Sequence, residues 1–144
     1  MENKKEFWVL GHKISPHNVS GNYDMVTGET PPNVPGPPPH YHSKLSELFF
    51  VLEGKMEFNL DGKSVILNKG ESIDLSPNCV HTFSNAGNTS CKWLNVHSPK
   101  GFLSFFENFG IDAHEENAAE KSVDDSIIQN VMQKAADYDM LIKI

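Results

Sequence analysis

The sequence predicts an all-β fold, one antiparallel barrel or sandwich followed by a short helical segment. Three observations lead to this prediction. Apolar runs between residues 48 and 97 are short and are separated by regularly spaced turn signals. Six of the nine prolines fall within Thr30–Pro39, where their fixed φ and missing amide donor exclude a helix or a central strand. A helical spacing of apolar residues begins only after Pro99.

Each strand is predicted from a local pattern. Phe7–Ile14 carries aromatic and β-branched residues typical of a strand, whereas Ser15–Gly28 is predicted to be a loop with one short strand at Tyr23–Val26. The apolar run Leu48–Leu52 ends at a Glu-Gly turn signal. The remaining strands are expected at Met56–Leu60, Ser64–Leu67, Ile73–Leu75, Val80–Phe83 and Lys92–His97.

Helical segments are predicted after the strands. Gly101–Phe109 has a helical spacing of phenylalanines. Ser122 is predicted to cap a second helix that runs to about Asp137. The tail Tyr138–Ile144 is expected to be a strand or an extended cover. We therefore assign residues 1–110 to the barrel and residues 111–144 to a helical extension of the same domain. One apolar face of the second helix is formed by Val123, Ile127, Ile128, Val131, Met132 and Ala135.

Length and charge narrow the class of protein. A chain of 144 residues is long enough for one domain with its own core. The net charge of −7 and the lack of a basic stripe argue against nucleic acid or an anionic membrane as partner, and no apolar run is long enough to span a membrane. The N-terminal residues lack the apolar stretch of a secretory signal, so we expect a cytoplasmic protein. Cys79 and Cys91 are then expected to be reduced, with a disulfide between them as the alternative.

Four residues form a candidate metal site. His40 and His42 are two residues apart, which places both imidazoles on one face of a strand. Glu47 follows at an odd offset, so an irregular stretch or bulge is expected at Ser43–Ser46 to return its side chain to that face. His81 comes from a separate strand after a proline-containing turn.

These residue types suit one divalent transition-metal ion, with Fe, Mn, Ni, Co, Cu and Zn as the candidates. Imidazole binds several of these ions, and a carboxylate adds negative charge. Three histidines and one glutamate leave one or two positions open for water, substrate or dioxygen. A purely structural ion is the alternative, although structural zinc sites usually hold four ligands that are often thiolates. The isolated histidines His12, His17 and His114 are given no role.

The spacing of these residues resembles the first motif of the cupin superfamily. That motif is H-x-H, three or four residues, Glu, six residues and Gly. Here it is formed by His40, His42, Glu47 and Gly54. Its opening glycine, Gly36, stands closer to the first histidine than is usual in the family.

The second cupin motif is matched with two departures. It runs from Gly70 through a proline-containing turn to His81 and Asn85. Ser76 replaces the usual proline of the turn and Asn78 the usual glycine. Both changes affect the shape of the turn and not the ligands, since Pro77 and Asn78 still form a tight turn.

Further segments resemble small bacterial cupins described as quercetin 2,3-dioxygenase-like. They are Pro35–His42, Glu47–Gly54, His97–Phe102 and, more loosely, the helical extension. The resemblance covers residues 30–110 and implies a cupin (jelly-roll) β-barrel whose metal is held by the three histidines and the glutamate. It further implies that Glu47 is also a base, which takes the proton of an enolic or aromatic hydroxyl before the enolate reacts with dioxygen.

A substrate pocket is expected beside the ligands. Phe49, Phe58 and Phe83 are its candidate residues, because they share the ligand face of their strands or lie on a buried face. Trp93 and His97 are weaker candidates. The alternative is a structural role, since every barrel core is apolar.

Cupins have many functions, so the resemblance leaves the activity open. We predict a metal-dependent dioxygenase acting on a small-molecule substrate. The alternatives are a non-catalytic module that binds metal or a small ligand, and a metal-dependent isomerase or epimerase that uses no dioxygen. Because closed two-fold symmetry is common, a homodimer is expected, with Phe7–Ile14 and Phe102–Phe109 as material for the partner surface.

Overall fold

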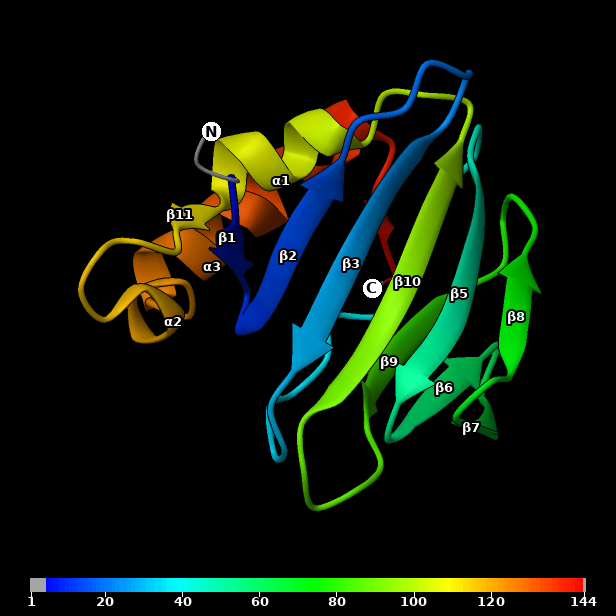
Figure 1. Ribbon diagram of the computed structural model, residues 1–144. Helices are drawn as coiled ribbons and strands as arrows, with labels where there is room; N and C mark the ends of the chain where they lie inside the picture. The colour runs from blue at the N-terminus through cyan, green and yellow to red at the C-terminus, as the bar shows by residue number, and fades with distance from the viewer. Residues whose placement is uncertain (1–4, 144) are drawn as a thin grey trace.

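The computed structural model describes residues 5–143, in which two antiparallel β-sheets face each other and helices lie along one edge (Figure 1). The larger sheet has the strand order β11-β1-β2-β3-β10-β5-β8, and the smaller has the order β12-β4-β9-β6-β7. The predicted all-β fold is therefore confirmed. The barrel consists of two open sheets that do not close into one hydrogen-bonded ring, which is the jelly-roll arrangement.

The element bounds are as follows. The larger sheet contains β1 (Phe7–Val9), β2 (His12–His17), β3 (Asp24–Thr30), β5 (Ser46–Glu53), β8 (Ser72–Leu75), β10 (Cys91–Ser98) and β11 (Ile111–Asp112). The smaller sheet contains β4 (His40–Tyr41), β6 (Lys55–Leu60), β7 (Lys63–Asn68), β9 (His81–Asn85) and β12 (Leu141–Ile142). The helices are α1 (Leu103–Phe109), α2 (Ala118–Lys121), α3 (Asp125–Lys134) and the 3₁₀ helix η1 (Ala135–Tyr138).

The N-terminal third contains more strand than the sequence predicts. The single strand expected over Phe7–Ile14 is a hairpin of β1 and β2. The segment expected to be mostly loop forms the end of β2 and the start of β3. Its inward positions include Asp24 and Gly28, which are not apolar, so the alternation typical of a strand is hidden. Gly28 lies against the Trp93 ring, where an added Cβ would be 2.2 Å from a ring atom.

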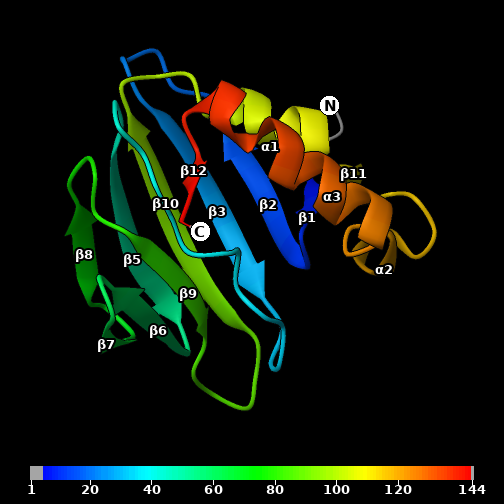
Figure 2. The same ribbon diagram turned by 180° about the vertical axis from the view of Figure 1, so that it is seen from behind.

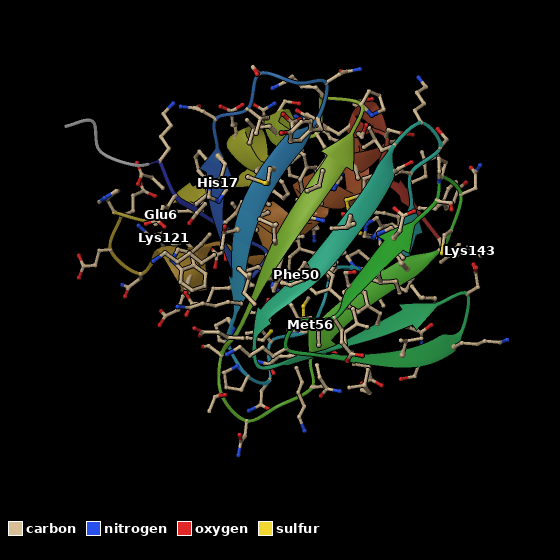
Figure 3. The ribbon with its side chains drawn as sticks, turned by 45° about the vertical axis from the view of Figure 1, so that its right-hand side comes forward. Glu6, His17, Phe50, Met56, Lys121 and Lys143 are labelled. Atoms are coloured by element: carbon tan, nitrogen blue, oxygen red, sulfur yellow. The ribbon has the colours of Figure 1, made fainter. Side chains whose placement is uncertain are left out.

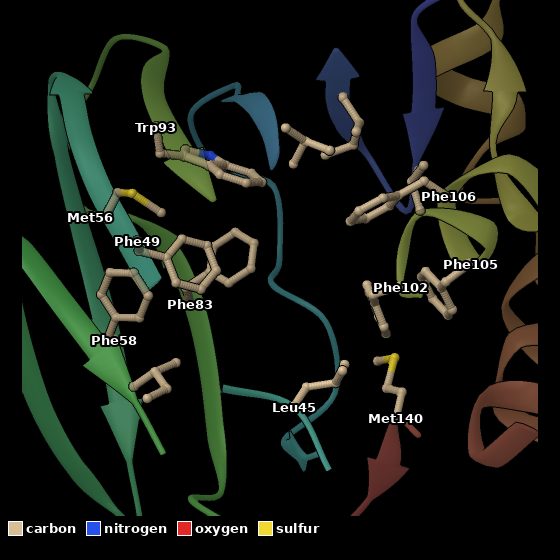
Figure 4. Close-up of a cluster of buried hydrophobic side chains, with 14 of the residues drawn as sticks. Leu45, Phe49, Met56, Phe58, Phe83, Trp93, Phe102, Phe105, Phe106 and Met140 are labelled. Carbon is tan, nitrogen blue, oxygen red and sulfur yellow. The ribbon is translucent and has the colours of Figure 1, made fainter. Parts of the chain in front are cut away.

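An aromatic cluster fills the space between the sheets (Figure 4). The Phe49 ring centroid lies 4.9 to 5.4 Å from those of Phe58, Phe83 and Trp93. Met56 is fully buried in the same cluster, and Figure 3 shows it between the sheets. Each such side chain contributes roughly 1.5–3 kcal/mol by leaving water, so this cluster is a rigid wall for whatever lies beside it.

A second cluster, from α1, covers the neighbouring part of the sheet (Figure 4). The Asp24 carboxylate accepts hydrogen bonds from the backbone N–H groups of Gly101 and Leu103, which fixes the start of this helix. The phenylalanines of Phe102–Phe109, which the sequence offered as material for a partner surface, are buried in their own chain. The cluster consists of Phe102, Phe105, Phe106, Phe109 and Met140.

Ser122 does not cap the last helix as predicted. The residue before α3 is Asp124, and Ser122 is fully buried two residues earlier. Its hydroxyl accepts a hydrogen bond from the Gly11 N–H at 3.0 Å and donates one to the Ala119 carbonyl at 2.6 Å. The hydroxyl therefore joins the β1–β2 turn to the helical segment.

The apolar face predicted for α3 is only partly buried. Val131 and Ala135 are buried in the core, whereas Val123, Ile128 and Met132 are exposed. The helix lies at the edge of the sheets (Figure 2), and Val131 is its buried residue.

The C-terminal tail forms a strand on its own barrel. Strand β12 pairs with β4 through Leu141 opposite Tyr41 and Ile142 opposite His40 (Figure 2). The tail therefore lies directly beside the strand that carries the first histidine of the candidate site.

Candidate metal centre

The three predicted histidines lie together at one end of the smaller sheet. His40 on β4 stands opposite His81 on β9, with ring centroids 4.3 Å apart. His42 follows β4 directly, and its ring centroid lies 5.1 Å from that of His40 and 5.5 Å from that of His81. All three are buried, and one nitrogen of each lies within 4.8 Å of the others.

Each of these rings is oriented by the same kind of hydrogen bond. The Nδ1–H of each histidine donates to a backbone carbonyl, which leaves the lone pair on Nε2. Nε2 of His42 and Nε2 of His81 have no hydrogen-bond partner among the described residues. The acceptors for His40, His42 and His81 are the carbonyls of Pro38 at 2.9 Å, Asp139 at 2.7 Å and Cys79 at 2.9 Å.

Glu47 reaches the histidines from the larger sheet. The irregular stretch predicted at Ser43–Ser46 is a crossover between β4 and β5 and not a bulge within one strand. The carboxylate is buried, and its Oε1 lies 2.9 Å from Nε2 of His81 and 3.7 Å from Nε2 of His42. Oε1 has no directed hydrogen bond among the described residues.

Charge and burial set the protonation of this cluster. Burial acts to raise the pKa of Glu47, but the surrounding imidazoles of His97, His42 and His81 hold it well below its usual range. Burial lowers the pKa of His40 to about 3, and the neighbouring His81 acts in the same direction. The site therefore combines a carboxylate with a neutral imidazole, as metal ligation requires.

His97 completes the environment of Glu47, although the sequence ranked it as a weak candidate. Its Nε2 lies 2.7 Å from Glu47 Oε2, and Asn95 Nδ2 donates to the same oxygen at 3.1 Å. Strand pairing explains the contact, since His97 on β10 stands directly opposite Glu47 on β5. The sequence signal that could have identified His97 is the alternation along β10, which places Trp93 and His97 on the same buried face.

The proline-rich segment holds the first histidine in place. It crosses from β3 to β4, and the Pro37 carbonyl accepts a hydrogen bond from the Thr82 hydroxyl at 2.5 Å. Gly36 passes so close to β9 that a Cβ there would lie 1.8 Å from the Phe83 carbonyl oxygen. The motif glycine is therefore needed for close approach of the backbone.

The departure at the second motif is also accommodated. Asn78 has a φ of +73°, a left-handed conformation that asparagine tolerates better than most residues. Its backbone N–H donates to the His42 carbonyl at 2.7 Å. This turn therefore joins the strand of His81 to the segment that carries His42.

A small cavity of about 60 Å³ opens beside the cluster. Two of the three predicted pocket residues, Phe49 and Phe83, line it, as does Trp93. Phe58 does not line it; this side chain packs behind Phe49 in the core. Phe105 and Phe106 of α1, Phe102 just before that helix, and Met140 close the opposite wall, so the cavity lies between the two apolar clusters of Figure 4.

The remaining candidates are placed as follows. His17 contacts the Thr27 hydroxyl at 2.6 Å, and the exposed His114 contacts Asp112 at 3.0 Å. His12, which the sequence left without a role, is buried and lines the cavity. Cys79 and Cys91 are free thiols.

The residues of the cluster fit a divalent transition-metal ion. Nε2 of His42, Nε2 of His81 and Oε1 of Glu47 are buried, lie close together and lack hydrogen-bond partners among the described residues. Such atoms are costly to bury unless a bound group satisfies them. Neutral imidazoles with one carboxylate are a donor set that first-row transition metals accept.

Comparison with known proteins agrees with this geometry. A family model described as the cupin domain matches residues 26–97, half of the chain. A quercetin 2,3-dioxygenase of Bacillus subtilis (strain 168) is 31% identical over 93 residues, which are 65% of this chain and 27% of that protein. The chain thus spans about a quarter of the length of that relative.

Solved structures show the same fold. An RmlC-like cupin from Shewanella frigidimarina has a TM-score of 0.60 at 22% identity, over 69% of this chain and 86% of that one. A cupin described as a sugar phosphate isomerase, from Silicibacter pomeroyi, has a TM-score of 0.58 at 18% identity, over 63% and 61%.

No helix among residues 5–143 is long and apolar enough to cross a membrane. The matched motifs, the paired sheets and the family match together establish that this chain belongs to the cupin superfamily.

Proposed function

We propose that this cupin is a metal-dependent dioxygenase that acts on a compact, uncharged enol or aromatic hydroxyl compound. The observation that carries the proposal is the cluster of converging, unpartnered ligand atoms of His42, Glu47 and His81 that opens onto an apolar cavity. The 31% identity to part of a quercetin 2,3-dioxygenase supports the same reaction class. Dioxygen is then the oxidant, and because both of its atoms enter the product, no separate reductant is needed.

The residues of the site have distinct roles in this proposal. When bound, the metal ion would act as a Lewis acid that stabilises the oxyanion of the substrate. Glu47 accepts the hydroxyl proton, and Asn95 and His97 hold the other carboxylate oxygen in place. The apolar walls keep water from the anion, which makes these electrostatic interactions stronger.

Size and charge narrow the substrate. A cavity of about 60 Å³ is too small for a molecule of several rings. Of residues 5–143, no lysine lines the cavity, and the chain contains no arginine. Away from the metal centre, a phosphate or carboxylate group would therefore lack a cationic side chain to pair with in this cavity.

A metal-dependent isomerase is the second candidate. The pair of Glu47 and His97, 2.7 Å apart, can take a proton from one carbon and return it to another. A structural neighbour described as a sugar phosphate isomerase makes this worth testing, although the uncharged cavity wall disfavours a phosphorylated substrate.

Oxygen uptake separates the two candidates. We would load the protein with Fe, Mn, Co, Ni or Cu in turn and measure dioxygen consumption with a set of small cyclic enols and phenols. The proposal expects uptake with one metal and a large loss of turnover in Glu47→Gln. Substrate-dependent proton exchange with deuterium from solvent, without oxygen uptake, would instead establish the isomerase.

A further inference from the structure

One histidine of the cavity lies outside the metal centre. His12, the first residue of β2, is 4% exposed and lines the same cavity as His40 and His42. Its Nδ1 lies 2.9 Å from the Thr30 hydroxyl oxygen, but its Nε2 has no hydrogen-bond partner among the described residues. A buried polar atom without a partner lowers stability unless a bound molecule satisfies it.

His12 stands a short distance beyond the metal-binding residues. Its ring centroid is 5.1 Å from that of Phe83, which follows His81 by two residues on β9. His12 and the metal-binding residues His40, His42 and Glu47 line one cavity, and Phe49 and Phe83 also line it.

The hydrogen bonds around Thr30 assign the tautomer of His12. Trp93 Nε1–H donates to the Thr30 hydroxyl oxygen at 3.0 Å, so this hydroxyl can direct its own proton to Nδ1 of His12. We assign the N–H of the ring to Nε2 on this basis. Burial lowers the pKa of His12 to about 4, although the Pro35 carbonyl acts to raise it, so the ring is neutral at pH 7.

We propose that His12 is a second anchor for the substrate, whose Nε2–H binds an oxygen atom at the end opposite to the group that meets the metal centre. This inference rests on the proposed function and narrows the substrate class. The substrate is a compact, planar, uncharged molecule with an enolic or aromatic hydroxyl at one end. At the other end it carries a carbonyl or hydroxyl oxygen, because the Nε2–H of His12 is a hydrogen-bond donor that needs an acceptor.

Two variants test the roles of the two ring nitrogens of His12 separately. His12→Asn keeps a polar atom near the position of Nδ1, for Thr30, but has none near Nε2. His12→Gln places its amide nitrogen near the position of Nε2. Two probes are compared on the protein loaded with Co²⁺: phenol and 4-hydroxybenzaldehyde, which adds a carbonyl oxygen opposite the hydroxyl. Binding is followed by the visible absorbance of the cobalt, and cobalt content and Tm are measured for every variant.

The expected result is selective. 4-Hydroxybenzaldehyde should bind wild type and His12→Gln about tenfold more tightly than His12→Asn, while phenol binds all three alike. Equal aldehyde affinity in all three, with normal cobalt content, would overturn the inference and leave the proposed function standing. A parallel loss of both probes and of Tm in both variants would show that His12 is structural. If neither probe bound to loaded wild type, the proposed function and this inference would fail together.

Discussion

At the scale of single residues, the chemistry follows from how each histidine uses its two ring nitrogens. His40, His42 and His81 give Nδ1–H to backbone carbonyls and keep Nε2 for a metal. His97 uses Nε2 differently, because it contacts the second oxygen of Glu47. Motif spacing in the sequence identifies the first group. It does not identify His97, whose contact depends on the register between β5 and β10.

Replacing His97 should lower the affinity for the metal, although His97 is not one of the four ligands of the motif. In His97→Asn the shorter side chain cannot reach Glu47 Oε2, so the carboxylate loses a partner that orients it. We expect metal affinity to fall about 10–100-fold, as is typical when an outer partner of a ligand is removed. A competition titration with a chromophoric chelator measures this. His114→Asn is the control, since that side chain is exposed, and equal affinity in both variants would contradict the role of His97.

Two phenylalanines with the same sequence pattern should behave differently. Phe83 lines the cavity, whereas Phe58 lies behind Phe49. Both Phe83→Leu and Phe58→Leu should lose about 1 kcal/mol of stability through imperfect packing. Only Phe83→Leu should alter phenol binding to the Co²⁺ protein. An equal change of phenol affinity in Phe58→Leu would contradict the assignment of Phe83 to the cavity wall and Phe58 to the core behind it.

At the scale of elements, the C-terminal segment is part of the metal centre. Strand β12 pairs with β4, and the Asp139 carbonyl orients His42. The Asp139 carboxylate also accepts the N–H groups of Ser43 and Lys44, which fixes the crossover to Glu47. The sequence predicts a strand or cover in this segment but not its partner, because antiparallel pairing between residues about 100 apart leaves no local signal.

Removing this segment should weaken the metal site. A chain that ends at Tyr138 lacks both the carbonyl for His42 and strand β12, so we expect at least a tenfold loss of metal affinity. Asp139→Gly is the matched variant, because it keeps the backbone carbonyl and tolerates the φ of +60° but removes the carboxylate. Its metal affinity should fall less than that of the truncated chain. The opposite order would show that the loop contacts, and not the carbonyl, support His42.

Helical elements show where sequence patterns fail. Ser122 has the residue type of an N-cap, yet its hydroxyl is used by the distant Gly11. The apolar stripe of α3 predicts a fully packed face, yet Val123, Ile128 and Met132 are exposed. In both cases a tertiary contact, or its absence, outweighs a local preference. The predicted homodimer stays a prediction, and sedimentation of the purified protein would test it.

At the scale of the whole molecule, the site joins the two sheets. Three histidines belong to the smaller sheet or its edge, and Glu47 and His97 belong to the larger. A bound ion therefore connects both halves of the barrel, and its binding free energy adds to the stability of the folded state. The fold and the four motif residues were accessible from the sequence because hydrophobic alternation and fixed spacing are local. The cavity walls were not, because they come from packing between distant segments.

Stability of the metal-free protein should fall on mild acidification. Burial lowers the pKa of His12 to about 4 and that of His40 to about 3, both from 6.5. Between pH 6.5 and 4 the unfolded chain therefore binds protons that the folded protein excludes. As the pH decreases through this range, the free energy of unfolding should fall by up to about 1.4 kcal/mol per pH unit for each of the two histidines.

Urea unfolding of the metal-free protein at pH 7, 6 and 5 measures this slope. His12→Asn should show a shallower dependence, because one of the two groups is gone. The raised pKa of His81 acts in the opposite direction above pH 6.5, where its stabilising contribution is lost as the pH rises. A urea midpoint that rises as the pH is lowered from 7 to 5 would contradict the neutral state of His12 and His40 in the folded protein.

The most direct test of the metal centre is elemental analysis of protein purified without added metal and without a nickel column. The measurement is made on wild type and on the His40→Ala/His42→Ala double variant, each checked for folding by circular dichroism. We expect about one equivalent of a divalent transition metal in wild type and almost none in the variant. Two folded proteins that both lack metal, and that take up none when titrated with Fe, Mn, Co, Ni, Cu and Zn, would contradict the metal centre.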